Sequence, residues 1–262
     1  MDLFSSLPKG LFNNFEGIKT EGSFSFNLFF EYDSRQVDSL KFVSDFSSKD
    51  FKILKYGVTD FSLIRDNFKY NIYDNNGRYV RSKYMGEGSE DYVKLEDISD
   101  YLKNSVITAE DGMFRYHKGF DEYAFKLSII RNIKEKRFAK GGSTITMQLV
   151  KNLFLNRNKT IARKLEEALI VWIIENKKIL SKDRILEIYL NAIEWGPNVY
   201  GINEASWFYF DKPPIKLNLA ESIFLSLIIP NPKNFMYYFD DNGNMKSFVY
   251  DYYKFISKKL LS

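Results

Sequence analysis

The sequence predicts an α+β protein in which a smaller β-rich region precedes a mainly α-helical domain. Two patterns support this class. Apolar and polar residues alternate in the first part of the chain, and apolar residues recur at helical spacing from about residue 95 onward. A polar, glycine-containing loop at residues 86–91 separates the two patterns. We therefore expect a β-rich region over residues 1–90, as a platform or partner surface, and a helical domain over residues 91–262.

Three segments of the first region predict strands. Residues 23–32 carry an apolar side chain at every second position, which predicts a strand with one apolar face. Residues 51–58 are a second candidate. Residues 70–80 predict a hairpin, because two short apolar runs flank Asn76-Gly77, a pair typical of tight hairpin turns. We find no constellation of catalytic residues in this region.

Helical periodicity dominates the rest of the chain. The segment 95–109 has apolar residues at 95, 98, 102, 106 and 109, and its carboxyl end leads into Glu110. The segment 160–179 predicts a long helix with Leu165 on its apolar face and Glu167 on its polar edge. Further helices are expected over 123–138, from the turn that begins at Gly141 through Phe154, from 181 or 182 onward, over 217–229 between prolines, and over 246–260.

Composition limits the kinds of functional site that the chain can form. Of the 262 residues 45% are hydrophobic, which is enough for a core, and the absence of cysteine excludes disulfides and thiolate metal sites. A single histidine argues against a zinc site. The net charge of +4 is uneven, because residues 131–184 contain 14 Lys/Arg and only 5 Asp/Glu. Such a field suits an anionic partner such as phosphate, nucleic acid or an acidic membrane, although a solvated helical face is the more common explanation.

The basic, amphipathic segment 123–138 bears on membrane binding. From its residues alone, a helix on a bilayer surface and an ordinary surface helix with a buried stripe are equally good interpretations. The first residues lack the pattern of a signal peptide, and no apolar run reaches the roughly 18–20 residues of a spanning helix. We therefore expect either peripheral membrane binding or an anchor that this chain does not contain.

Residues 109–121 concentrate reactive side chains. Glu110 and Asp111 stand close to Phe114 and to the lone histidine, His117. Apolar neighbours raise the pKa of a carboxyl group by desolvation, which would suit it to general acid or base catalysis, although most acidic pairs are caps or solvated corners. We interpret His117 as structural, as a donor to a backbone or carboxylate oxygen.

Other candidates lie downstream. Gly141-Gly142-Ser143-Thr144 opens a helix and would present backbone N–H groups to an anion, although most such starts are simple caps. Glu167 follows Arg163 and Lys164 at helical spacing, and by itself this favours an ion pair on a helix face. A polar cluster after the glycine turn would suit a diphosphate: Lys151, Asn152, Arg157 and Lys159. A polar edge interpreted as structural contains Glu187, Asn191 and Glu194.

Together these motifs resemble those of the family 51 peptidoglycan glycosyltransferases, the polymerase module of class A penicillin-binding proteins and of monofunctional biosynthetic transglycosylases. Four occur in order: Glu110-Asp111-x-x-Phe114-x-x-His117-x-Gly119, Gly141-Gly142-Ser143-Thr144-Ile145-Thr146-x-Gln148-x-x-Lys151-Asn152, Arg163-Lys164-x-x-Glu167, and Ile185-Leu186-Glu187-x-Tyr189-Leu190-Asn191. Residues 221–232 resemble a fifth. The resemblance covers about residues 70–235. Met147 departs from it, because many members have glutamine there.

The resemblance implies a mainly α-helical, lysozyme-like domain that polymerises lipid II into β-1,4 glycan strands, with inversion and release of undecaprenyl diphosphate. It assigns Glu110 as general base. Glu167, the second catalytic residue, would orient the neighbouring cations or hold Mg²⁺ or another divalent cation on the diphosphate. No organic cofactor is implied. Substrate-binding roles fall on Asp111, Phe114, Ser143, Thr146, Gln148, Lys151, Asn152, Lys159, Arg163 and Lys164. Structural roles near the site fall on His117, Gly119, Glu187 and Asn191.

The implied partners are lipid II, the nascent glycan chain and the membrane surface, with cell-wall synthesis proteins as further candidates and no nucleic acid. The implied location is the outer, periplasmic face of the bacterial cytoplasmic membrane. The segment 123–138 falls where the family has a mobile, membrane-dipping segment, which favours the bilayer interpretation. Two alternatives remain: a catalytically idle scaffold that binds lipid-linked precursors, and a lytic transglycosylase-like muramidase, which would not need Arg163-Lys164-x-x-Glu167.

Overall fold

The computed structural model describes residues 12–74, 76–136, 141–155 and 160–260. The chain forms two compact units, each of which combines two separate stretches of sequence. The first unit contains the residues up to Leu63 together with Tyr116–Ile179, and the second contains Ile64–Arg115 together with the residues from Leu180 onward. Both units therefore draw on early and late parts of the sequence, and the boundary suggested near residue 90 stays a prediction.

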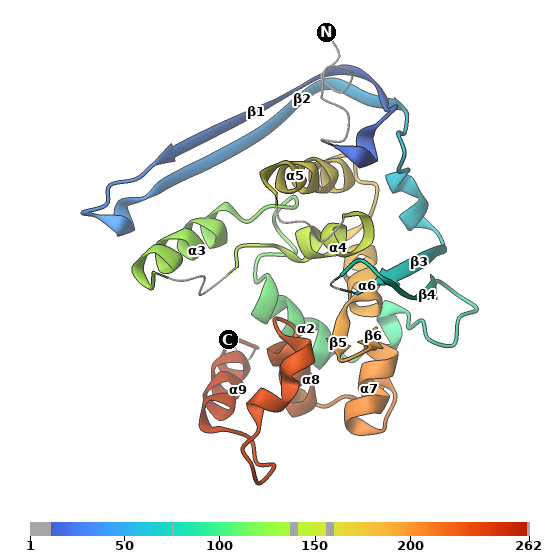
Figure 1. Ribbon diagram of the computed structural model, residues 1–262, viewed down its shortest axis with the longest axis vertical. Helices are drawn as coiled ribbons and strands as arrows, with labels where there is room; N and C mark the ends of the chain where they lie inside the picture. The colour runs from blue at the N-terminus through green and yellow to red at the C-terminus, as the bar shows by residue number, and fades with distance from the viewer. Residues whose placement is uncertain (1–11, 75, 137–140, 156–159, 261–262) are drawn as a thin grey trace. The chain divides into compact units, whose positions relative to one another are not determined.

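The first unit combines a long β-hairpin with three helices, over which the hairpin extends (Figure 1). Strand β1 (Lys19–Glu31) runs antiparallel to β2 (Lys41–Lys55). The helices are α3 (Glu122–Lys134), α4 (Ile145–Phe154) and α5 (Ile161–Asn176). Side chains cap the first turn of each helix, because Asp121, Thr144 and Thr160 accept hydrogen bonds from backbone N–H groups there.

The second strand is longer than the sequence predicted. We expected a strand to begin at Phe51, whereas β2 begins at Lys41. Residues 47–50 are Ser-Ser-Lys-Asp, so no apolar alternation marks this part of the strand. Pairing with β1 extends it, since Ser47 lies opposite Ser25 in the antiparallel register.

Aromatic side chains attach the hairpin to the helices. Trp172 of α5 is almost fully buried, and its ring centroid lies 5.9 Å from that of Phe24 and 6.3 Å from that of Phe46. Phe42 of β2 packs on Phe125 of α3 with their centroids 4.8 Å apart. Packed aromatic pairs of this kind bury large apolar areas, so they hold one face of the hairpin against the unit.

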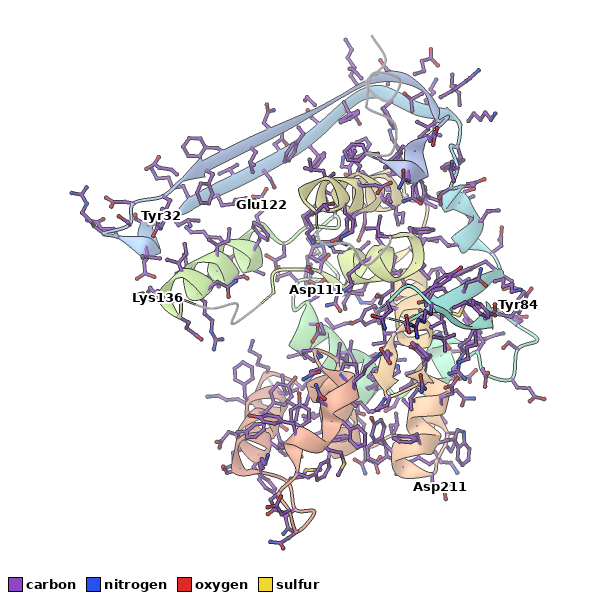
Figure 2. The ribbon with its side chains drawn as sticks, viewed as in Figure 1. Tyr32, Tyr84, Asp111, Glu122, Lys136 and Asp211 are labelled. Carbon is purple, nitrogen blue, oxygen red and sulfur yellow. The ribbon has the colours of Figure 1, made fainter. Side chains whose placement is uncertain are left out.

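Polar bonds fix both ends of α3 to the hairpin. Glu122 at the start of α3 lies below the hairpin (Figure 2), where it accepts hydrogen bonds from the backbone N–H and the hydroxyl of Ser44 at 2.9 and 2.6 Å. Near the other end, Lys134 pairs with Asp38 at 2.5 Å. The segment predicted as a helix over 123–138 is therefore a helix as far as Lys134, and residues 137–140 lie outside the described part of the chain.

Helix α5 differs from its expected faces. Leu165, expected inside, is 47% exposed, whereas Glu167, expected on the polar edge, is 1% exposed. Glu166 is also buried, where it accepts hydrogen bonds from the backbone and the side-chain amide of Asn14 at 2.8 and 2.9 Å. Buried carboxylates persist only where their charge is compensated, and apolar periodicity contains no information on such compensation.

The described residues of the second unit form two small antiparallel sheets and five α-helices. Strands β3 (Phe68–Tyr73) and β4 (Tyr79–Met85) make the hairpin expected over residues 70–80, and β5 (Glu194–Gly196) pairs with β6 (Val199–Tyr200). The helices are α2 (Asp100–Glu110), α6 (Lys182–Ala192), α7 (Ile202–Phe210), α8 (Leu219–Ile228) and α9 (Ser247–Leu260). Helix α2 packs against α8 and α9 (Figure 1).

Helix α2 begins later than expected and ends where expected. Leu95–Asp97 forms a separate 3₁₀ turn, and the backbone of Ile98 is extended, so the α-helix starts at Asp100. Its last residue is Glu110, in agreement with the prediction. The class prediction of α+β is also confirmed, because helices predominate and the strands form two-stranded sheets in the described part of the chain. Within that part no helix has both the length and the apolar character needed to cross a bilayer.

We predict that Trp172→Ala lowers the free energy of unfolding by about 3–5 kcal/mol, because it removes a buried indole from the hairpin contact. Leu165→Ala on the same helix is the matched control and should cost less than about 1 kcal/mol, since its side chain is largely in water. Urea unfolding of the three proteins provides the measurement. Similar losses for both variants would contradict the role of Trp172 as an anchor.

Candidate active site

Glu110 is held at the end of α2 by a tight turn. The N–H of Asp111 donates to the carbonyl of Ile107 at 2.9 Å, and the carbonyl of Asp111 accepts from the N–H of Phe114 at 2.9 Å. Asp111 (Figure 2) and Phe114 are buried, whereas Glu110 is half-buried. The turn therefore has a buried apolar interior, and Glu110 stands at its boundary with solvent.

Two tyrosines lie within electrostatic reach of Glu110. Tyr189 of α6 is fully buried, and burial raises its pKa, with a further increase from the charges of Glu110 and Asp111. Burial is also the main cause that raises the pKa of Tyr252 on α9 to about 12, and the charge of Glu110 adds to it. The Tyr252 hydroxyl lies 3.3 Å from that of Ser226 on α8. Both phenols are therefore neutral at physiological pH.

Helix α6 holds the segment that leads into α2. The side-chain amide of the buried Asn191 donates to the carbonyl of Val93 at 2.8 Å and accepts from its N–H at 2.9 Å. Glu187 accepts a hydrogen bond from the N–H of Leu95 at 2.7 Å and another from the hydroxyl of Tyr92. These bonds fix the start of α2, and with it the position of Glu110 two to three turns later.

In the first unit, Arg163, Lys164 and Glu167 meet on one face of α5. One oxygen of the buried Glu167 carboxylate lies 2.5 Å from the Lys164 amine, and the other lies 3.3 Å from the Arg163 guanidinium. The Lys164 amine also lies 3.4 Å from the hydroxyl of Ser143. Lys164 is 42% exposed, and Nε of Arg163 is buried without a hydrogen-bond partner among the described residues. A single buried anion thus fixes two cations that retain donors for a ligand.

The start of α4 is fixed by Thr144 and Gly119. The Thr144 hydroxyl accepts from the N–H of Met147 at 3.2 Å and donates to the carbonyl of Gly119 at 2.7 Å. Gly119 has φ of +97°, and a Cβ at this position would lie 2.5 Å from Val171. Nδ1 of His117 accepts from the N–H of Gly119 at 3.0 Å. In this bond the imidazole is therefore an acceptor, whereas we expected it to be a donor.

The other predicted residues of the first unit differ in exposure. Thr146 is fully buried, and its hydroxyl donates to Glu175 at 2.6 Å. The remaining predicted positions on α4 are partly buried or exposed: Gln148, Lys151 and Asn152. Two predicted positions lie outside the described residues: Arg157 and Lys159.

The two units divide the predicted site residues between them. The described residues of the second unit place Glu110, Asp111 and Phe114 in one turn, with α6 behind it. The first unit brings together Ser143 and the ionic cluster of α5. Sequence reasoning missed Tyr92 and Tyr252. Neither belongs to a motif. Tyr92 lies in the irregular segment before α2 and bonds to Glu187, and Tyr252 comes within electrostatic reach of Glu110 through the packing of α9 on α2.

The donor set around Glu167 does not fit a metal site held by the protein. No group of three or more His, Asp or Glu side chains suited to a metal ion occurs among the residues that the structure describes. Both oxygens of Glu167 are already engaged by cations. A divalent ion at this position would have to displace Lys164 or Arg163.

Comparison with known proteins assigns the family. Residues 76–250, about two thirds of the chain, match the family described as Transglycosylase. The chain belongs to this family. The motif-based recognition is thereby confirmed, and the transglycosylase match continues past residue 235, where the expected coverage ended, into α9. By its family the protein is a transglycosylase.

Relatives named biosynthetic peptidoglycan transglycosylase support the assignment. The protein from Nitrosomonas eutropha is 49% identical over 142 residues, which are 54% of this chain and 57% of the relative. The protein from Acinetobacter baylyi is 36% identical over 176 residues, which are 66% of this chain and 76% of the relative. The protein from Methylobacillus flagellatus is 42% identical over 158 residues, or 60% and 66% of the two chains. The aligned part thus spans between about half and three quarters of these relatives.

We predict that Gly119→Ala in this transglycosylase lowers the free energy of unfolding by about 1–3 kcal/mol, because the new methyl group meets Val171 in a left-handed backbone conformation. Gly112→Ala is the control, since a Cβ there has no neighbour within 4 Å among the described residues. Chemical denaturation of both variants gives the comparison. Equal stability of Gly119→Ala and the parent would show that the turn before α3 is not constrained as described.

Proposed function

We propose that this transglycosylase polymerises lipid II, with the growing glycan chain as donor and lipid II as acceptor. One observation carries the proposal: the buried Glu167 holds Arg163 and Lys164 beside Ser143. Fixed cations with free donors suit a departing diphosphate, because charge-assisted hydrogen bonds stabilise the negative charge that develops on the leaving group. In this proposal Glu167 acts on the substrate through the two cations that it orients.

Glu110 is the proposed general base. It would take the proton from the 4-hydroxyl of the acceptor while that oxygen attacks the anomeric carbon of the donor, and undecaprenyl diphosphate would leave. A single displacement inverts the anomeric carbon from α to β and needs no covalent glycosyl-enzyme. Its position supports this role, because Glu110 is half-buried at the edge of a buried turn and lies within electrostatic reach of two neutral phenols.

The other predicted positions complete the proposed site. Ser143 and the exposed side of α4, with Gln148, Lys151 and Asn152, would bind sugar or phosphate oxygens, and Lys159 would add a cation. Asp111 and Phe114 would shape the turn that carries the base, and Thr146 would support the start of α4 through Glu175. We further propose a lysozyme-like arrangement for the helical part of the chain and a working place on the periplasmic face of the cytoplasmic membrane.

The proposed reaction uses the cations of the protein for the leaving group. A divalent ion such as Mg²⁺ would be held mainly by the diphosphate itself, because Glu167 supplies a single carboxylate that is already paired twice.

The ionic cluster favours polymerisation over the two alternatives. A lytic muramidase cleaves a glycan whose leaving group carries no diphosphate, so fixed cations at this place would have no substrate charge to neutralise. An idle scaffold needs no general base, yet α2 is clamped at its start and delivers Glu110 to the boundary with solvent.

We predict that Glu110→Gln reduces polymerisation of lipid II by a factor on the order of 10² to 10⁴, since the amide keeps the shape of the side chain but cannot accept the proton. The measurement is the rate of glycan formation from labelled lipid II in detergent. The parent protein should be active in the same assay with added Mg²⁺. An inactive parent, or a Glu110→Gln variant as fast as the parent, would contradict the proposal.

We also predict that Lys164→Ala lowers turnover by a factor on the order of 10² to 10³, because it removes a cation from the proposed diphosphate site. Lys258→Ala is the matched control, since it removes an equal charge from the exposed end of α9. It should retain nearly full activity. Equal effects of the two changes would show that Lys164 contributes only to the general positive field.

A further inference from the structure

A charged pocket lies in the second unit beside the first half of α2. Its volume is about 790 Å³, which is within the range of sites for small ligands. Most of its described lining residues are charged, with acidic and basic side chains in similar numbers, and Leu95 is an aliphatic exception. Helix α2 contributes Asp100, Lys103 and Asn104. A ligand with charges of both signs suits this lining better than an apolar or purely anionic one.

The pocket and Glu110 share one helix, so their separation follows from helix geometry. Lys103 and Glu110 are seven residues apart and lie on the same face of α2, and a rise of about 1.5 Å per residue places them roughly 10 Å apart along the axis. Arg115 also lines the pocket, and it follows directly on the turn that carries Glu110. The pocket therefore begins about the length of a disaccharide from the proposed base.

The charges at the rim of the pocket can exchange partners. Lys103 pairs with Asp100 at 2.8 Å, and Arg115 pairs with Asp183. The two carboxylates are 88% and 67% exposed, whereas Lys103 is 16% exposed and also donates to the carbonyl of Leu95 at 3.1 Å. Ion pairs with such exposed carboxylates contribute only about 0–1 kcal/mol, so a carboxylate of a ligand can replace Asp100 or Asp183 at low cost.

The floor of the pocket is rigid by comparison. Arg184 bonds to Glu187 at 2.6 Å, to the carbonyl of Asp66 at 2.8 Å and to the hydroxyl of Tyr92. Glu187 in turn holds the N–H of Leu95. A rigid floor with an exchangeable rim is an arrangement suited to a ligand that brings its own charges.

We propose that this pocket binds the peptide stem of the acceptor lipid II, a short peptide that carries carboxylates and an ammonium group. The proposal rests on the proposed function, because Glu110 must hold the acceptor sugar for the stem to reach the pocket. The stem branches from the sugar next to the one whose 4-hydroxyl reacts, so it leaves the disaccharide at about the distance at which the pocket begins. Lys103 and Arg115 would bind its carboxylates, and Glu96 would bind its ammonium group.

Steady-state kinetics with two acceptors tests this assignment. One acceptor is lipid II with its complete stem, and the other is lipid II with the stem trimmed to the lactyl group. Lys103→Ala and Arg115→Ala should each raise KM for the complete acceptor on the order of fivefold, with kcat unchanged, because one charge-assisted contact is lost. Neither variant should change KM for the trimmed acceptor. Lys69→Ala is the control, an exposed lysine of β3 outside the pocket, and should change neither KM.

Equal effects on the two acceptors, or no effect on either, would overturn the proposal, provided that thermal unfolding shows both variants folded. A parent that polymerises neither acceptor would instead refute the proposed function.

The pocket is then tested by calorimetry with the soluble disaccharide-pentapeptide. Weaker binding to Lys103→Ala than to the parent and Lys69→Ala supports the pocket, and equal or undetectable binding to all three refutes it.

Discussion

The buried carboxylate of Glu167 is the interaction on which the site of the first unit depends. A carboxylate that leaves water must be compensated, and here Arg163 and Lys164 of the same helix do so. The cations compensate the charge of Glu167, and Glu167 in turn holds the two cations in place next to Ser143. The same helix carries Trp172 under the hairpin and Glu166 against Asn14, so α5 is both the anchor of the unit and the support of its cations.

The structure of the second unit holds the carboxylate of Glu110 at a defined position. Helix α2 is held at its start by Glu187 and Asn191. Its end lies near Tyr189 and Tyr252, whose pKa values are raised mainly by burial and also by the charge of Glu110. Side chains of α6 act at both ends of α2, since Asn191 and Tyr189 belong to that helix. The fourth family motif thus provides both the clamp, Glu187 and Asn191, and a buried neighbour of the base, Tyr189.

The sequence predicted those features that local patterns determine. Helical spacing located the end of α2 at Glu110, and the Asn76-Gly77 pair located the hairpin of β3 and β4. The sequence did not predict features that depend on contacts with residues distant in the chain. The polar half of β2 is a strand because β1 pairs with it, Leu165 is exposed because Glu167 takes the inner position, and Tyr252 reaches Glu110 through the packing of α9 on α2. Motif order identified the family, but no spacing rule revealed these contacts.

The central claim is that Glu167 acts by orienting the cations beside it. The most direct measurement is the effect of Glu167→Gln on kcat/KM in two backgrounds, the parent and Lys164→Ala, under the same Mg²⁺ concentration. If Glu167 acts through Lys164, the loss caused by Glu167→Gln in the parent should largely disappear in the Lys164→Ala background, because the cation that it orients is already absent. An equal loss in both backgrounds would contradict the account, since Glu167 would then act independently of that lysine.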